Sequence, residues 1–109
     1  MATTYKILGQ SAPTTTTLTD VYTTPAATST IVSTLTVANR SATEDTFRIA
    51  VRPAGATVSD EHYIIYDAPV SGNSLASFTI GLTLAETDVI SVYSTNGTTS
   101  FNVFGSELT

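Results

Sequence analysis

The sequence predicts an all-β protein, folded as a single antiparallel β-sandwich of jelly-roll-like type with about eight short strands. Apolar and polar residues alternate in short runs, and no helical apolar spacing of three and four persists over three turns. The chain contains 23 threonines and 12 serines, and this hydroxyl-rich composition with few charges favours strands over helices. Turn residues recur about every ten residues, which fits a double sheet better than an open sheet.

The first four expected strands are short alternating segments. They are Tyr5–Leu8, Leu18–Thr23, Thr30–Asn39 and Phe47–Val51. In the third segment Ile31, Leu35 and Val37 share one parity, so we expect these side chains to lie on one mainly buried face. The fourth segment ends before Pro53, because proline cannot donate a hydrogen bond to a sheet.

Two further strands are expected in the middle of the chain. One is Tyr63–Tyr66, and the other runs from Ala76 to Leu82, where Phe78 and Ile80 continue the apolar alternation. Three segments with little strand signal are expected to be surface loops: Gly9–Thr17, Pro53–Glu61 and Asp67–Asn73.

The last two strands are expected to form a hairpin around Asn96-Gly97, because both residues tolerate the positive φ of a type I′ turn. Counting outward from the turn pairs Val92 with Phe101 and Ile90 with Val103. Directly opposite side chains share a face of the sheet. We therefore expect these four apolar side chains to lie together in the core.

Residues 1–109 are expected to form one domain, since chains this short rarely divide into two separately packed cores. The two ends, about residues 1–4 and 106–109, carry little that would pack. We expect them to be short arms that add a strand to the sheet edge of a neighbour.

The charge balance and the missing cysteines exclude several classes of protein. Four Lys and Arg against nine Asp and Glu give a net charge of −5, which excludes a basic nucleic-acid-binding surface. The absence of cysteine excludes a disulfide scaffold and a thiolate metal site. No apolar run approaches the roughly 18 residues of a membrane span, and residues 1–6 lack the pattern of a secretory signal. We expect synthesis in the cytoplasm, with no membrane or nucleic-acid partner.

Residues suited to catalysis or metal binding are scarce. Asp60, Glu61 and the single histidine, His62, are adjacent, but neighbours on a strand point to opposite faces and converge on an ion only in an irregular segment. There is no Gly-x-Ser-x-Gly motif and no Gly-rich phosphate loop, and nothing selects a pair of carboxylates for hydrolysis. We predict a protein that is not an enzyme, with no catalytic residues, no metal site and no cofactor.

Five residues are candidates for contact with a partner: Arg48, Arg52, Tyr63, Tyr66 and Tyr93. The two arginines share the outward parity of their strand and would suit an acidic partner surface; a solvated face is the alternative. Tyr63 and Tyr66 have opposite parity, so we expect one of them to be exposed or at an interface, and core packing is the alternative. Tyr93 lies on the polar side of the expected hairpin.

A family resemblance comes from five strand and turn segments that span most of the chain from Val21 to Glu107. They are VYTTPA (21–26), TFRIAV (46–51), YIIYD (63–67), IGLTL (80–84) and FNVFGSE (101–107). In this layout the chain resembles small all-β virion structural proteins of tailed bacteriophages, including cyanophages. These segments are strand and turn patterns, so no functional residue transfers from the family.

The resemblance implies a capsid decoration (cement) protein on the outer surface of the virion, bridging subunits of the major capsid protein. Such modules commonly assemble on threefold positions, so the resemblance also implies a homotrimer. A tail, neck or fibre-associated module for assembly or host-surface attachment is the alternative, and it should present a shallow tyrosine-lined surface near Tyr63 or Tyr93. A carbohydrate-active enzyme or free lectin would instead need a concave site with convergent carboxylates or aromatic rings.

Overall fold

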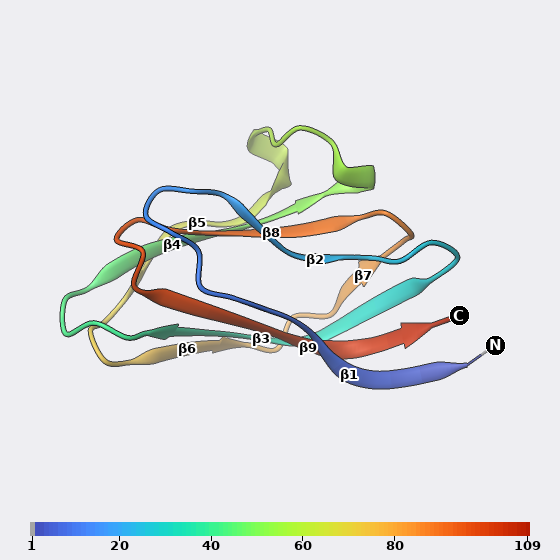
Figure 1. The fold of residues 1–109 in the computed structure, drawn as a ribbon, viewed down its shortest axis with the longest axis horizontal. Coiled ribbons are helices and arrows are strands. Elements are labelled where there is room, and N and C mark those ends of the chain that lie inside the picture. Colours follow the sequence, from blue (N-terminus) through green and yellow to red (C-terminus); the bar gives the residue numbers. More distant parts are fainter. Residues whose placement is uncertain (1) are drawn as a thin grey trace.

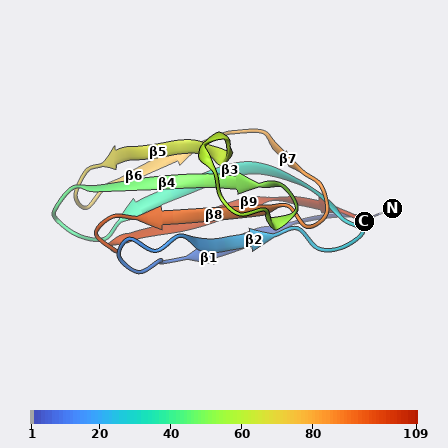
Figure 2. The same ribbon diagram turned by 90° about the horizontal axis from the view of Figure 1, so that it is seen from above.

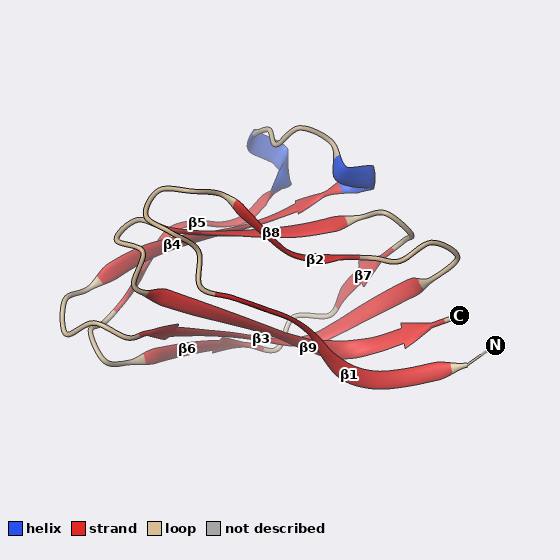
Figure 3. Cartoon of the chain, in the orientation of Figure 1, coloured by secondary structure: helices blue, strands red, loops and turns tan. Residues whose placement is uncertain are grey.

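The computed structural model describes residues 2–109, which form nine β-strands and two single-turn 3₁₀ helices (Figure 3). The strands are β1 (Thr3–Ser11), β2 (Thr19–Thr23), β3 (Ser29–Asn39), β4 (Asp45–Arg52), β5 (Tyr63–Val70), β6 (Leu75–Phe78), β7 (Leu82–Leu84), β8 (Val89–Ser94) and β9 (Thr99–Leu108). The helices, η1 (Pro53–Gly55) and η2 (Asp60–His62), lie in the loop between β4 and β5. The predicted all-β class is confirmed.

The strands form two antiparallel sheets that pack face to face (Figures 1 and 2). Sheet A has the order β1-β9-β3-β6, with β7 also paired to β3, and sheet B has the order β2-β8-β4-β5. Strands that follow one another in the sequence mostly lie in opposite sheets, and β6 with β7 takes the place of a single strand. This is the arrangement of an eight-stranded jelly roll, as the sequence predicts.

The core lies between the sheets and is built from the inward-facing apolar side chains of both. Its central ring is Phe47, which packs against Phe78 and Phe101 with centroid separations of 6.2 and 6.0 Å. The buried cluster consists of Val21, Tyr22, Val32, Leu35, Val37, Phe47, Ile49, Val70, Leu84, Ile90, Val92, Phe101 and Val103.

The predicted hairpin at Asn96-Gly97 is wrong. Strands β8 and β9 belong to different sheets, so residues 95–98 cross from sheet B to sheet A and do not turn back within one sheet. Gly97 has a φ of +72°, but Asn96 has no positive φ, and a type I′ turn requires both. The four apolar residues placed in the core are nevertheless all buried, because they face one another across the sandwich.

A β-bulge in β3 changes which of its side chains are buried. The pairing of β3 with β9 shifts between Val32 and Thr34, so the inward parity changes at Ser33. Leu35 and Val37 are buried as expected, but Ile31 lies on the outer face and is 43% exposed. The prediction that Ile31 belongs to the buried face is therefore wrong.

Several strand boundaries also differ from the expectation. The alternating run from Ala76 to Leu82 is divided into β6 and β7, because residues 79–81 do not pair with β3. The segments expected as loops at Gly9–Thr17 and Asp67–Asn73 contain the ends of β1 and β5. The loop expected at Pro53–Glu61 is present and projects beyond sheet B (Figure 1).

The expected terminal arms are instead the paired ends of β1 and β9. Thr3 and Thr4 pair with Leu108 and Glu107, and Ala2 and Thr109 exchange backbone hydrogen bonds of 3.0 and 2.9 Å. Backbone pairing holds these segments although their side chains contribute little packing. The two ends of the chain consequently lie side by side (Figure 1); Met1 is outside the described residues.

Buried polar side chains connect the sheets, among them those of Asp45 and Tyr22. Asp45 of sheet B accepts hydrogen bonds from Ser94 and from Thr99 at the start of β9. The Tyr22 hydroxyl donates to Glu107 at 2.6 Å and lies 2.7 Å from the Thr30 hydroxyl, which joins β2 to β9 and β3. Burial, followed by the hydrogen bond to Glu107, raises the pKa of Tyr22 to about 12.

Candidate functional site

Four of the five candidate contact residues come together on the outer face of sheet B. Arg48 on β4 lies directly opposite Tyr93 on β8, and its guanidinium carbon is 4.3 Å from the centroid of the Tyr93 ring and 4.2 Å from that of Tyr66 on β5. These are cation–π distances. We call Arg48, Tyr63, Tyr66, Asp67 and Tyr93 the tyrosine–arginine cluster.

Tyr63 and Tyr66 share this outer face although their sequence parity differs. Pairing of β5 with β4 is irregular: Tyr63 pairs with Ala50, but Ile65 pairs with Ile49, so an extra residue is inserted between them. The two tyrosine rings meet edge to face, with centroids 4.9 Å apart and planes at 84°. Tyr66 is 58% exposed and Tyr63 is half-buried.

Asp67 fixes the position of Arg48. It has a φ of +51°, unusual for a residue other than glycine, and lies at a second irregularity in the pairing of β5 with β4. Its two carboxylate oxygens accept hydrogen bonds from Arg48 Nε at 2.6 Å and Nη2 at 3.3 Å. This two-pronged contact raises the pKa of Arg48 further above its usual value. The positive charge of Arg48 is therefore balanced within the cluster.

An open depression of about 440 Å³ lies beside the cluster and is lined by Asp60, Tyr63 and Tyr66. Asp60 is the first residue of η2. His62 stabilises this turn, because its Nδ1 accepts a hydrogen bond from the backbone N–H of Ser59 at 3.1 Å. Within residues 2–109 the Asp60 carboxylate makes no hydrogen bond or ion pair. The depression thus combines two aromatic rings with an uncompensated negative charge.

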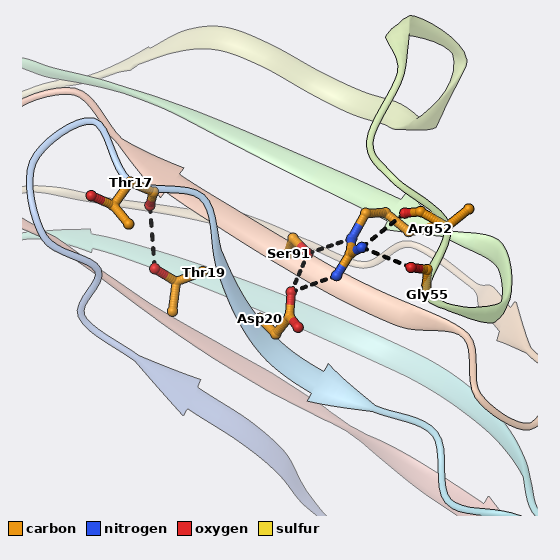
Figure 4. Close-up of polar contacts among 7 residues, drawn as sticks. Thr17, Thr19, Asp20, Arg52, Gly55 and Ser91 are labelled. Atoms are coloured by element: carbon orange, nitrogen blue, oxygen red, sulfur yellow. Dashed lines mark hydrogen bonds and ion pairs between the residues drawn. The ribbon is translucent and has the colours of Figure 1, made fainter.

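Arg52, the fifth candidate, lies apart from the cluster and is 15% exposed in its side chain. Its guanidinium donates to Ser91, to Asp20 at 2.7 Å and to the carbonyl oxygens of Gly55 and Ala56 (Figure 4). These contacts tie η1 to strands β2, β4 and β8. Arg52 therefore holds the base of the projecting loop, and four of the five N–H groups of its guanidinium are used within the chain.

A second surface feature lies on the outer face of sheet A. The side chains of Tyr5 and Ile31 lie on strands that flank β9, and both pair with Ser106 in one cross-strand row. Tyr5 is 83% exposed. The groove at this position, also of about 440 Å³, is lined by Tyr5, Lys6, Ile31, Ser33, Phe104, Gly105 and Ser106. We call it the apolar groove.

Neither surface brings together the groups of a metal site. Among residues 2–109 no cluster of three or more His, Asp, Glu or Cys side chains is close enough to hold a metal ion. No helix in the described part of the chain is long and apolar enough to cross a membrane. The two surfaces present aromatic, apolar and charged contact area.

Sequence reasoning identified the tyrosines and Arg48 but not the reasons that they meet. The irregular pairing of β5 that places Tyr63 beside Tyr66 has no sequence signature of its own. The apolar groove could not be predicted because no sequence pattern marks the bulge that turns Ile31 outward. The matching parity of Tyr5 and Ile7 on β1 was the one available signal for an apolar outer face.

A comparison of the chain with models of known protein families, with curated proteins and with solved structures gave no match.

Proposed function

We propose that this protein is a structural component of a bacteriophage virion, a decoration protein that binds the outer surface of the capsid. It docks on the major capsid protein through the apolar groove and works as a homotrimer that bridges neighbouring capsid subunits. No chemical step is required of it. Its binding free energy adds to the work needed to separate the subunits under the pressure of packaged DNA.

The exposed apolar side chains of sheet A are the observation that supports a docking surface, and the capsid as its occupant comes from the resemblance to virion structural proteins. Tyr5, Ile7 and Ile31 are all large, apolar and exposed, and they lie next to one another across β1, β9 and β3. A monomer gains nothing by leaving such a patch in water, whereas burial of each large side chain at an interface contributes about 1.5–3 kcal/mol. A capsid subunit of matching shape is the occupant we assign to it.

Substitution in the groove tests the docking surface. The double variant Tyr5→Ser, Ile31→Ser removes the apolar contact without touching the core. We expect it to lose binding to purified capsid shells assembled without this protein, measured by co-sedimentation. The matched control is Ile64→Ser, which removes an exposed apolar side chain from sheet B. Unchanged binding of the double variant would overturn the proposal. Analytical ultracentrifugation of the free protein tests whether it forms a trimer.

A tail, neck or fibre-associated module is the second candidate, and the depression between Tyr63 and Tyr66 is the observation that favours it. In that position the tyrosine–arginine cluster would face a tail protein or a host surface. Cryo-electron microscopy of the particle separates the two: density at threefold positions of the shell supports decoration. Density confined to the neck, tail or fibres would replace that proposal with the second candidate.

A further inference from the structure

The depression beside the tyrosine–arginine cluster lies on the sheet opposite the apolar groove, and the proposed capsid contact leaves it without a role. We propose that it is a binding site for an organic cation, the ammonium or guanidinium group of a lysine or arginine side chain presented by a partner protein. This inference does not depend on the identity of the particle, because it follows from the groups that line the depression.

The two tyrosine rings supply the first part of the site. An aromatic ring carries partial negative charge on its face, so it attracts cations, and rings that surround a cation on more than one side bind it better than a single ring does. Tyr63 and Tyr66 stand at 84° to each other with centroids 4.9 Å apart. They form a corner in which one cation contacts aromatic surface on two sides.

The Asp60 carboxylate supplies the second part. It lines the same open depression as the two rings and has no internal partner among residues 2–109. A carboxylate beside two rings selects for a cation over a neutral or anionic group, because it adds Coulombic attraction to the attraction of the ring faces.

The neighbouring residues show that this face already holds a cation in the same manner. Arg48 lies over the rings of Tyr66 and Tyr93 at 4.2 and 4.3 Å. Asp67 balances its charge through two hydrogen bonds, so Arg48 does not cancel the charge of Asp60. The net charge of −5 over the whole chain acts in the same direction, since it attracts cationic groups to the surface.

The test is an NMR titration of ¹⁵N-labelled protein with Nα-acetyl-lysine N-methylamide. Its neutral isostere, Nα-acetyl-norleucine N-methylamide, has the same backbone and nearly the same side-chain length without the charge. We expect the lysine compound to shift the amide signals of residues 60–66 and the norleucine compound to leave them in place. Binding of the lysine compound should weaken with added salt.

Two variants with the same change in net charge complete the design. Asp60→Asn should weaken the binding of the lysine compound by about two- to fivefold, the range that a single exposed charge or cation–π contact provides. Glu44→Gln changes an exposed carboxylate at the opposite end of β4 and should leave it unchanged. Both side chains are exposed, so both variants should keep the wild-type fold, with amide signals changed only close to the substituted residue.

Three results would overturn the inference. Equal shifts with the norleucine compound would mean an apolar site, and shifts at residues 60–66 with a methyl glycoside but not with the lysine compound would mean a sugar site. Equal effects of Asp60→Asn and Glu44→Gln would mean that only the overall charge of the protein attracts the cation. None of these results would bear on the capsid contact, which uses the other sheet.

Discussion

Replacing Asp45 with alanine tests whether one buried carboxylate holds the crossing from sheet B to sheet A. Asp45 is 1% exposed and accepts hydrogen bonds from the hydroxyls of Ser94 and Thr99, both at 2.5 Å. It also accepts from the backbone N–H groups of Thr46 at 2.8 Å and Asn96 at 2.9 Å. The Thr98 hydroxyl is a fifth, more distant donor at 3.5 Å, and alanine removes the acceptor for all of them.

The expected loss in the free energy of unfolding depends on whether each donor can find another acceptor. The hydroxyls rotate toward other acceptors, but the two backbone N–H groups lose their partner at about 1–2 kcal/mol each, and the bonds lost are the stronger, charge-assisted kind. Relief from burying a charge offsets part of this. We therefore expect a loss of about 3 kcal/mol in the free energy of unfolding, which is about 12–24 °C in Tm for a domain of this size.

Urea denaturation of three variants measures this loss. Asp45→Asn keeps the Oδ1 acceptor and should lose less than Asp45→Ala. Asp88→Ala is the matched control, because Asp88 also accepts two backbone hydrogen bonds, from Ala54 at 2.9 Å and Ala85 at 2.8 Å, but at the surface. Water replaces those bonds, so a loss below about 1 kcal/mol is expected. If Asp45→Ala loses no more than Asp88→Ala, the carboxylate does not hold the crossing.

Three further outcomes are expected. Burial acts to raise the pKa of Asp45, but hydrogen bonds from two hydroxyls and two backbone groups outweigh it and hold the pKa below its usual 3.8. The unfolded chain therefore binds the proton more readily, and the free energy of unfolding should fall as the pH drops below about 4. Urea titrations across that range should show a smaller fall in Asp45→Asn. Thr24→Val removes a buried hydroxyl that has no partner among residues 2–109, and should leave Tm unchanged or raise stability by up to about 1 kcal/mol; a clear loss would mean that the hydroxyl is bonded. In Gly105→Ala the new Cβ would lie 2.1 Å from the Ile31 carbonyl oxygen, which should lower the free energy of unfolding by about 2 kcal/mol. The Cβ of Gly81→Ala meets nothing within 4 Å, so this variant is the control. Equal melting temperatures for the two variants would contradict the close approach of β9 to β3.

Local alternation was enough to predict the fold class and most of the core, because the period of two records which face of a strand is buried. Phe47 and Ile49 lie in the core, as the alternation along their strand indicates. The partner of each strand could not be predicted in the same way. The Asn96-Gly97 pair is typical of a hairpin, yet the jelly-roll topology requires a crossing there, and turn preference is worth less than the packing of two whole sheets.

The candidate surfaces depend on departures from alternation, and this explains why the sequence predicted their residues better than their geometry. A strictly alternating strand sends every second side chain into the core, and a bulge reverses that assignment for the residues beyond it. The bulge at Ser33 turns Ile31 outward into the apolar groove, and the irregular pairing of β5 sets Tyr63 and Tyr66 on one face. Each irregularity sacrifices regular ladder pairing and leaves apolar or aromatic surface in water, which costs stability in the isolated chain. A partner that covers these surfaces would recover that loss, and so the irregular strand positions are where we expect the protein to be bound.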